Sequence, residues 1–169
     1  MNVLGNFYTL LAARLLNIKN EEGVSIIQHI DFWNQQFNED WKSPFGFPAV
    51  FLEYKTIPWQ TVGRHKQLAE LQFDLHIAST TKAKSQFNSQ FTTRWLEHLQ
   101  LIDAIHYWLS GFNGTFFGSI SRTGLTPDHF YGDIINHVMS FRCTMADTSA
   151  MRVYTRVEGD ILVLTLPPE

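Results

Sequence analysis

The chain has 169 residues, of which 44% are hydrophobic, 14% aromatic and 17% charged, and its formal net charge is −3. A chain of this length can bury about two-thirds of its unfolded surface in a single core, and its composition excludes intrinsic disorder. No basic block stands out, so nucleic-acid binding through phosphate contacts has no support.

The N-terminal segment is predicted to form a helix. Its apolar residues recur at intervals of three and four, and Asn6 can cap the helix start. The apolar positions are Leu4, Phe7, Leu11, Leu15 and Ile18. The segment has no basic leader and no small-residue cleavage site, and Arg14 interrupts the only run that could enter a membrane. We therefore expect neither a signal peptide nor a membrane span.

An alternating run and an aromatic-rich loop come next. The run VSIIQHIDFW, residues 24–33, predicts a strand. Residues 34–47 are rich in Asn, Gln, Pro and Gly and predict a loop. The aromatic residues of this loop are Phe37, Trp41, Phe45 and Phe47. Together with Trp59 they either pack into the core or anchor a partner.

Two further strands are predicted to pair as a long hairpin. The first, PAVFLEY, residues 48–54, begins at a proline and continues in residues that favour strands. The second, ELQFDLHIAS, residues 70–79, alternates between an apolar face of Leu71, Phe73, Leu75 and Ile77 and a polar face of Glu70, Gln72, Asp74 and His76. We expect the apolar face in the core. The polar face meets water, a substrate or another copy of the chain.

The strongest helix signal covers residues 90–111, with Ser89 as its cap. Two adjoining apolar stripes run along it, one of Trp95, Leu99, Ile102, His106 and Leu109 and the other of Leu101, Ile105, Trp108 and Phe112. We expect this helix to cover the sheet.

The rest of the chain is predicted to be mostly strand. GTFFGSISRTG (114–124) predicts a strand interrupted by glycines, TPDHFYGD (126–133) a turn or short helical piece, and HVMSFRCTMAD (137–147) an alternating strand. The tail holds two short alternating runs around EGD, which form either an extra hairpin or an extended arm. The expected fold is α+β, with a mostly antiparallel sheet of four to six strands packed against two helices. A single domain would span 1–147, followed by an arm or hairpin over 148–169.

The sequence offers little for catalysis or metal binding. Seven histidines occur without a metal-binding motif, and each is most simply a polar surface or helix-flank residue. Asp74 and His76 could face a substrate, but alternating polar residues are also what a half-exposed sheet needs for solubility. Cys143, the only cysteine, lies in an apolar set and is expected to be inert, in a cytoplasmic protein without disulfides. We expect no metal, no cofactor and no enzyme activity.

Five stretches of the chain correspond to the predicted elements in the order strand, strand, strand, helix, strand: IQHIDFWNQQF, FPAVFLEY, QLAELQFDLHIAS, LEHLQLIDAIHYWLSGF and HVMSFRCTMADT. In this order the chain resembles the tail terminator or tail-completion proteins of long-tailed bacteriophages and prophages. The resemblance covers about residues 3–147. It rests on the element order, the strand after an aromatic loop and the late strand that ends in Ala-Asp. The tail from Ala150 to Glu169 lies outside it.

The resemblance implies a ring-forming subunit, typically of a hexamer, that caps the phage tail tube and meets the head connector. DNA would pass through the ring without specific binding, and the protein would occur in the bacterial cytoplasm during assembly and then in the virion tail. The candidate interface residues are Phe37, Trp41, Phe45, Phe47, Glu70, Gln72, Asp74, His76, Ile161 and Val163. Two alternatives remain open: a monomeric ligand-binding or enzymatic α+β domain, and an adaptor that adds a strand to a partner's sheet.

Overall fold

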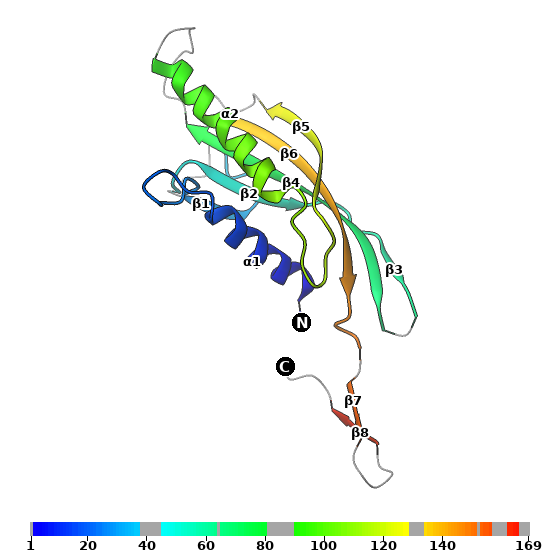
Figure 1. Ribbon diagram of the computed structural model, residues 1–169. Helices are drawn as coiled ribbons and strands as arrows, with labels where there is room; N and C mark the ends of the chain where they lie inside the picture. The colour runs from blue at the N-terminus through cyan, green and yellow to red at the C-terminus, as the bar shows by residue number, and fades with distance from the viewer. Residues whose placement is uncertain are drawn as a thin grey trace.

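A computed structural model describes residues 2–37, 45–63, 65–80, 90–128, 134–151, 153–156 and 162–165 (Figure 1). The elements are α1 (Val3–Leu16), β1 (His29–Phe32), β2 (Ala49–Tyr54), β3 (Trp59–Thr61), β4 (Gln67–Thr80), α2 (Gln90–Leu109), β5 (Ser121–Asp128), β6 (Ile134–Asp147), β7 (Val153–Arg156) and β8 (Leu162–Thr165). Six strands form one sheet in the order β1-β2-β4-β6-β5, with β3 also paired to β4. Only β1 and β2 run parallel. Both helices lie on one face of this sheet (Figure 1), which confirms the α+β class.

The main core lies between the helices and the central strands. Leu71, Phe73, Leu75 and Ile77 of β4 are fully buried there, as the alternation of the strand predicts. Antiparallel pairing places Phe73 opposite Phe141 of β6, and their rings stack at 5.4 Å. Burying side chains of this size stabilises the fold by about 1.5–3 kcal/mol each, so the two long central strands anchor the domain.

The first helix begins four residues earlier than the predicted cap. Asn2 is the N-cap, and its side chain accepts a hydrogen bond from the backbone N–H of Gly5 at 3.0 Å. The backbone N–H of Asn6 donates to the carbonyl of Asn2, so Asn6 already lies inside the helix. The apolar stripe was predicted correctly: Phe7, Leu11 and the positions that follow are buried against the sheet.

The second helix buries the inner part of its predicted stripes. Leu101, Ile102 and Ile105 are buried, whereas Leu99 is 44% exposed and His98 is buried in its place. Arg14 joins the two helices, because its Nε donates to the carbonyl of Trp108 at 3.0 Å and its guanidinium lies 4.7 Å from the centre of the Trp108 ring. Neither helix of the described chain combines the length and the apolarity that crossing a membrane would take.

Three sequence predictions are wrong in extent. Of the strand expected over 114–124, only the part from Ser121 onwards lies in β5. The expected strand over 24–33 is reduced to His29–Phe32, because Ser25 forms an antiparallel bridge with Lys19, just after α1, and the N–H of Asn20 donates to the carbonyl of Val24. Of the turn or helical piece expected over 126–133, Thr126 to Asp128 form the end of β5 instead, and residues 129–133 lie outside the described residues. Pro127 is tolerated there because β5 is an edge strand, where a missing N–H need not break a ladder.

Candidate functional site

The polar face of β4, opposite the helices, divides into a covered and an open half. Glu70 and Gln72 are exposed, as the sequence predicts. Asp74 and His76 are only 9% and 7% exposed, so within this half of the face the chain itself covers the polar side chains, an option that was not among those expected from the sequence. Period-2 alternation assigns side chains to a face, but it does not reveal whether another segment folds over that face.

Aromatic residues from the loop after β1 provide that cover. Phe37 is buried with Phe51 of β2 in a second small core, and their rings meet edge to face at 5.3 Å. Phe45 and Phe47 pack against the same core and are partly buried. Of the two alternatives for these aromatics, the structure places Phe37 inside its own chain and leaves Phe45 and Phe47 partly accessible. Trp41 lies outside the described residues.

His76 is the best-packed polar residue of this face. Its ring stacks on Trp33 at 4.0 Å between centroids, with an interplanar angle of 9°. Its Nε2 lies 3.0 Å from Oε2 of Glu53, while its Nδ1 is buried and has no hydrogen-bond partner among the described residues. The histidine thus links the loop to β2 and β4, a role that the sequence pattern did not indicate.

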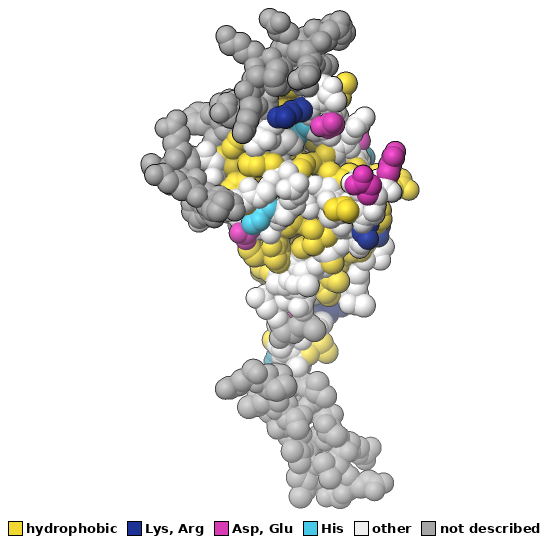
Figure 2. Space-filling model, turned by 90° about the vertical axis from the view of Figure 1, so that its left-hand side faces the viewer, with side chains coloured by type: hydrophobic (Ala, Val, Ile, Leu, Met, Phe, Trp, Pro, Cys, Tyr) yellow, Lys and Arg dark blue, Asp and Glu magenta, His cyan; other side chains and the backbone are white. Residues whose placement is uncertain are grey.

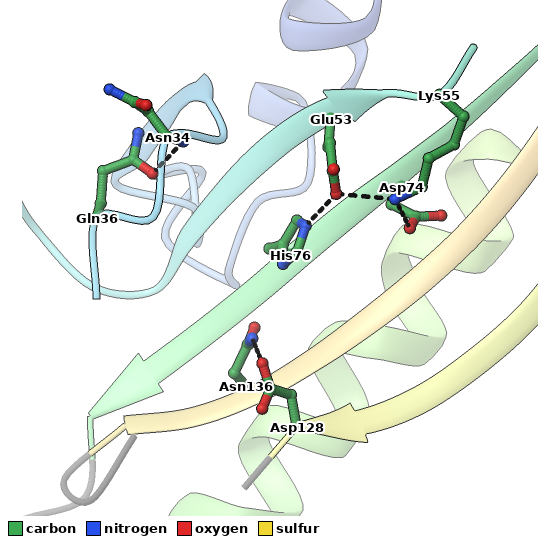
Figure 3. Close-up of polar contacts among 8 residues, drawn as sticks. All are labelled: Asn34, Gln36, Glu53, Lys55, Asp74, His76, Asp128 and Asn136. Atoms are coloured by element: carbon green, nitrogen blue, oxygen red, sulfur yellow. Dashed lines mark hydrogen bonds and ion pairs between the residues drawn. The ribbon is translucent and has the colours of Figure 1, made fainter. Parts of the chain in front are cut away.

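Glu53, Lys55 and Asp74 continue this network (Figure 3). Nζ of Lys55 lies 3.0 Å from Oε2 of Glu53 and 2.9 Å from Oδ2 of Asp74. Burial alone would raise the pKa of Glu53, but its hydrogen bonds with His76 and Lys55 outweigh burial and lower it. Burial would lower the pKa of Lys55, but its bonds to Asp74 and Glu53 raise it. The charges therefore compensate one another, which suits a structural network better than acid–base catalysis.

The open half of the face borders an open cavity of about 670 Å³. Its walls include Glu70, Gln72 and Phe116, the last from the loop between α2 and β5. That loop approaches β6 closely, because the N–H of Gly118 donates to the carbonyl of Thr144 at 2.8 Å. A Cβ at Gly118 would lie 2.4 Å from Oγ1 of Thr144, so this close approach requires glycine. The glycines of GTFFGS were the sequence signal for it.

The β1 edge of the sheet carries an exposed aromatic side chain. β1 pairs with β2 on one side, and within the part of the chain that the structure describes no strand pairs with its other side. Phe32 is 42% exposed and stacks on Tyr8 at 4.4 Å. Figure 2, which views this side of the molecule, shows hydrophobic side chains gathered across the middle of the face. An unpaired edge with apolar flanks can accept a further strand.

The C-terminal segment forms a hairpin of its own. β7 and β8 pair antiparallel, with Thr155 opposite Val163, in a two-stranded sheet separate from the main one. Figure 1 shows this hairpin beyond the end of β6 and away from both helices. Of the two alternatives for the tail, the structure shows the hairpin. Ile161 lies outside the described residues.

The described residues were compared with what a metal site and a reactive thiol need. No group of three His, Cys, Asp or Glu side chains there is arranged to hold a metal ion. Cys143 is buried in the core, and burial raises the pKa of its thiol to about 12. The thiol is therefore protonated and unreactive at neutral pH.

Neither a scan against known protein families nor a search of curated proteins finds a match to this chain.

Proposed function

We propose that the protein is a structural subunit that associates with further copies of itself into a ring, at the head-proximal end of a phage or prophage tail. The observation that carries this proposal is the β7–β8 hairpin, which extends beyond the main sheet (Figure 1) while the β1 edge of that sheet has no described partner strand. One element is therefore able to donate strands and another to accept them. Joined head to tail between copies, such a contact gives a ring when the rotation between neighbours closes.

The composition of the β7–β8 hairpin, called the arm from here on, supports its role as the element that donates a strand. Its second run, ILVLTL over residues 161–166, is apolar at nearly every position, so water is a poor environment for it. A two-stranded hairpin is only marginally stable by itself in water. Pairing with a neighbouring copy would cover the apolar side chains and satisfy the main-chain hydrogen bonds of the arm.

The two edges of the sheet differ in a way that favours β1 as the acceptor. β5 carries Pro127 and a register shift between Arg122 and Gly124, both of which discourage the addition of a strand. β1 has neither, and Phe32 adds exposed apolar surface.

The open half of the polar face fits the rest of the proposed ring. Glu70 is acidic and exposed, and the whole chain carries a net charge of −3. On a lumen wall, an acidic side chain such as Glu70 would repel the phosphate backbone and help DNA to slide past without sticking. The tail tube protein and the head connector would bind the two outer rims of the ring.

Deletion of residues 149–169 tests the proposal. We expect the shortened protein to remain folded but to associate weakly or not at all. Light scattering at increasing concentration measures the association of both proteins, and electron microscopy of the full chain shows whether it forms rings. If the shortened protein is unfolded by circular dichroism, the arm belongs to the core. If it assembles as well as the full chain, the arm has no role in assembly.

A matched pair of substitutions tests the acceptor edge. Phe32 on β1 and Leu125 on β5 are both 42% exposed and lie on opposite edges of the sheet. We expect Phe32→Lys to prevent self-association and Leu125→Lys to leave it unchanged, with both variants folded by circular dichroism. Equal loss of association in both variants would show that the β1 edge is not the specific acceptor of the neighbouring strand.

A further inference from the structure

A chain of hydrogen bonds joins β4, α2 and β6 on the face of the sheet that the helices cover. Oγ of Ser79 lies 2.9 Å from Nδ1 of His98, and Nε2 of His98 lies 3.0 Å from Nδ1 of His137. His98 is 1% exposed and His137 is buried, whereas Ser79 is only half-buried. The sequence pattern missed this set, because it assigned the histidines to the surface.

Ser79 and His98 also line a cavity. It has a volume of about 620 Å³ and lies between the end of β4, residues 94–104 of α2, residues 47–48 and Ile26. Apolar side chains such as Phe47 and Leu101 form much of its wall, and Arg94 lines it as well. This volume and this mixture of many apolar groups with a few polar ones are typical of small-molecule sites.

The side chains of Ser79, His98 and His137 follow one another in the order of a nucleophile, a base and a group that orients the base. When the hydroxyl of Ser79 donates to Nδ1 of His98, the proton of His98 lies on Nε2 and is donated to Nδ1 of His137. Burial, and to a lesser extent the neighbouring His137, lower the pKa of His98 to about 4. His98 is therefore neutral at pH 7 and Nδ1 can accept the hydrogen bond from Ser79, but the same shift makes His98 a weaker base than an ordinary histidine.

We propose that Ser79 is the nucleophile and His98 the general base of a site that hydrolyses carboxylic esters with a short apolar acyl group, and that His137 is a positioning residue. This activity is independent of the proposed assembly role. An ester fits because its acyl chain would occupy the apolar part of the cavity while its carbonyl carbon meets Oγ of Ser79. Arg94, which lines the same cavity together with Glu97, is the candidate donor to the oxyanion.

The reaction balances with water as the only co-reactant. Oγ of Ser79 attacks the carbonyl carbon, and its proton moves to Nδ1 of His98. The bond from the carbonyl carbon to the alkoxy oxygen then breaks, and that oxygen takes the proton from His98 and leaves as the alcohol. Water next attacks the acyl-serine and passes its proton to His98. The acid is released as the proton returns to Oγ of Ser79.

The first test is chemical labelling of the full-length protein with a fluorophosphonate probe, followed by peptide mass spectrometry. We expect the label on Ser79 of the unmodified protein, with no label on Ser79 in His98→Gln. Labelling of the unmodified protein needs no variant, so that part of the test cannot be obscured by an unstable variant, and circular dichroism of His98→Gln shows whether the second part applies to a folded protein. Absence of label from Ser79, or equal labelling of Ser79 in His98→Gln, overturns the proposal.

The second test is hydrolysis of p-nitrophenyl butyrate. We expect Ser79→Ala to lower kcat/KM by at least about 100-fold, and Ser121→Ala, at an exposed serine of β5, to leave it unchanged. His137→Leu should lower kcat while KM stays the same, because His137 orients the base and does not touch the ester. Full turnover in Ser79→Ala refutes the site, and a change in KM alone in His137→Leu refutes the positioning role.

Discussion

Mild acid should destabilise the protein through His98. This side chain lies beneath α2 and is 1% exposed, and burial together with His137 lowers its pKa from 6.5 to about 4. The folded protein therefore resists protonation of His98, whereas the unfolded chain takes up the proton below about pH 6.5. The protein has its full stability with respect to His98 above pH 6.5, where the side chain is neutral in both the folded and the unfolded state. The free energy of unfolding falls as the pH drops from 6.5 toward 4, because only the unfolded chain binds the proton there.

The size of the effect follows from the two pKa values. The full difference between 6.5 and about 4 corresponds to about 3 kcal/mol, of which about 2 kcal/mol is lost between pH 7 and pH 5. This is a large share of the stability of a typical domain. The loss should appear well before the carboxylates titrate, since their ordinary pKa values lie near 4.

Urea denaturation at pH 7, 6 and 5, followed by tryptophan fluorescence, measures the loss. We expect the free energy of unfolding to fall by about 2 kcal/mol in the unmodified protein and by much less in His98→Gln, whose side chain cannot titrate. His65→Gln, at an exposed histidine, is the control and should retain the full pH dependence. An equal fall in His98→Gln and in the unmodified protein would refute the argument, whatever the absolute stability of the variant.

The other expectations concern the sheet faces and metal. Leu75→Ala should lower the free energy of unfolding by about 2–5 kcal/mol, because Leu75 is fully buried, and Gln72→Ala by at most about 0.5 kcal/mol, because Gln72 is exposed; equal losses in chemical denaturation would contradict the assignment of faces. His76→Ala should cost about 1–3 kcal/mol, since it removes the stacking on Trp33 and the bond to Glu53, and a loss no larger than that of Gln72→Ala would show that this network contributes nothing. A chelator should leave the melting temperature unchanged, and a drop of several degrees would reveal a metal.

His76 shows where reasoning from the pattern alone stops. Its place in the alternating strand predicts a polar residue whose removal costs at most about 0.5 kcal/mol. The structure instead places it under Trp33, with Glu53 as its partner. The alternation correctly separates the faces, but the cover on the polar face comes from a loop that is distant in the sequence.

The same limit applies to the candidate ester site and to the ring. Ser79, His98 and His137 are far apart in the chain, and only strand register and the packing of α2 bring them into one hydrogen-bonded line. No short motif marks such a set. The hairpin of the tail was one of two alternatives from its alternating runs, but its separation from the main sheet was not predictable from them.

The sequence by itself determined the local features of this protein: the helical stripe that includes Phe7 and Leu11, the buried face of β4, the inert Cys143 and the α+β class. Each follows from a period of 2 or 3.6 residues, which depends only on neighbours along the chain. Only the tertiary structure decided that β1 runs parallel to β2, that loop aromatics cover half of the polar face and that His98 is buried. These features depend on contacts between segments that are distant in the sequence. The free energy of such contacts cannot be read from the pattern of neighbouring residues.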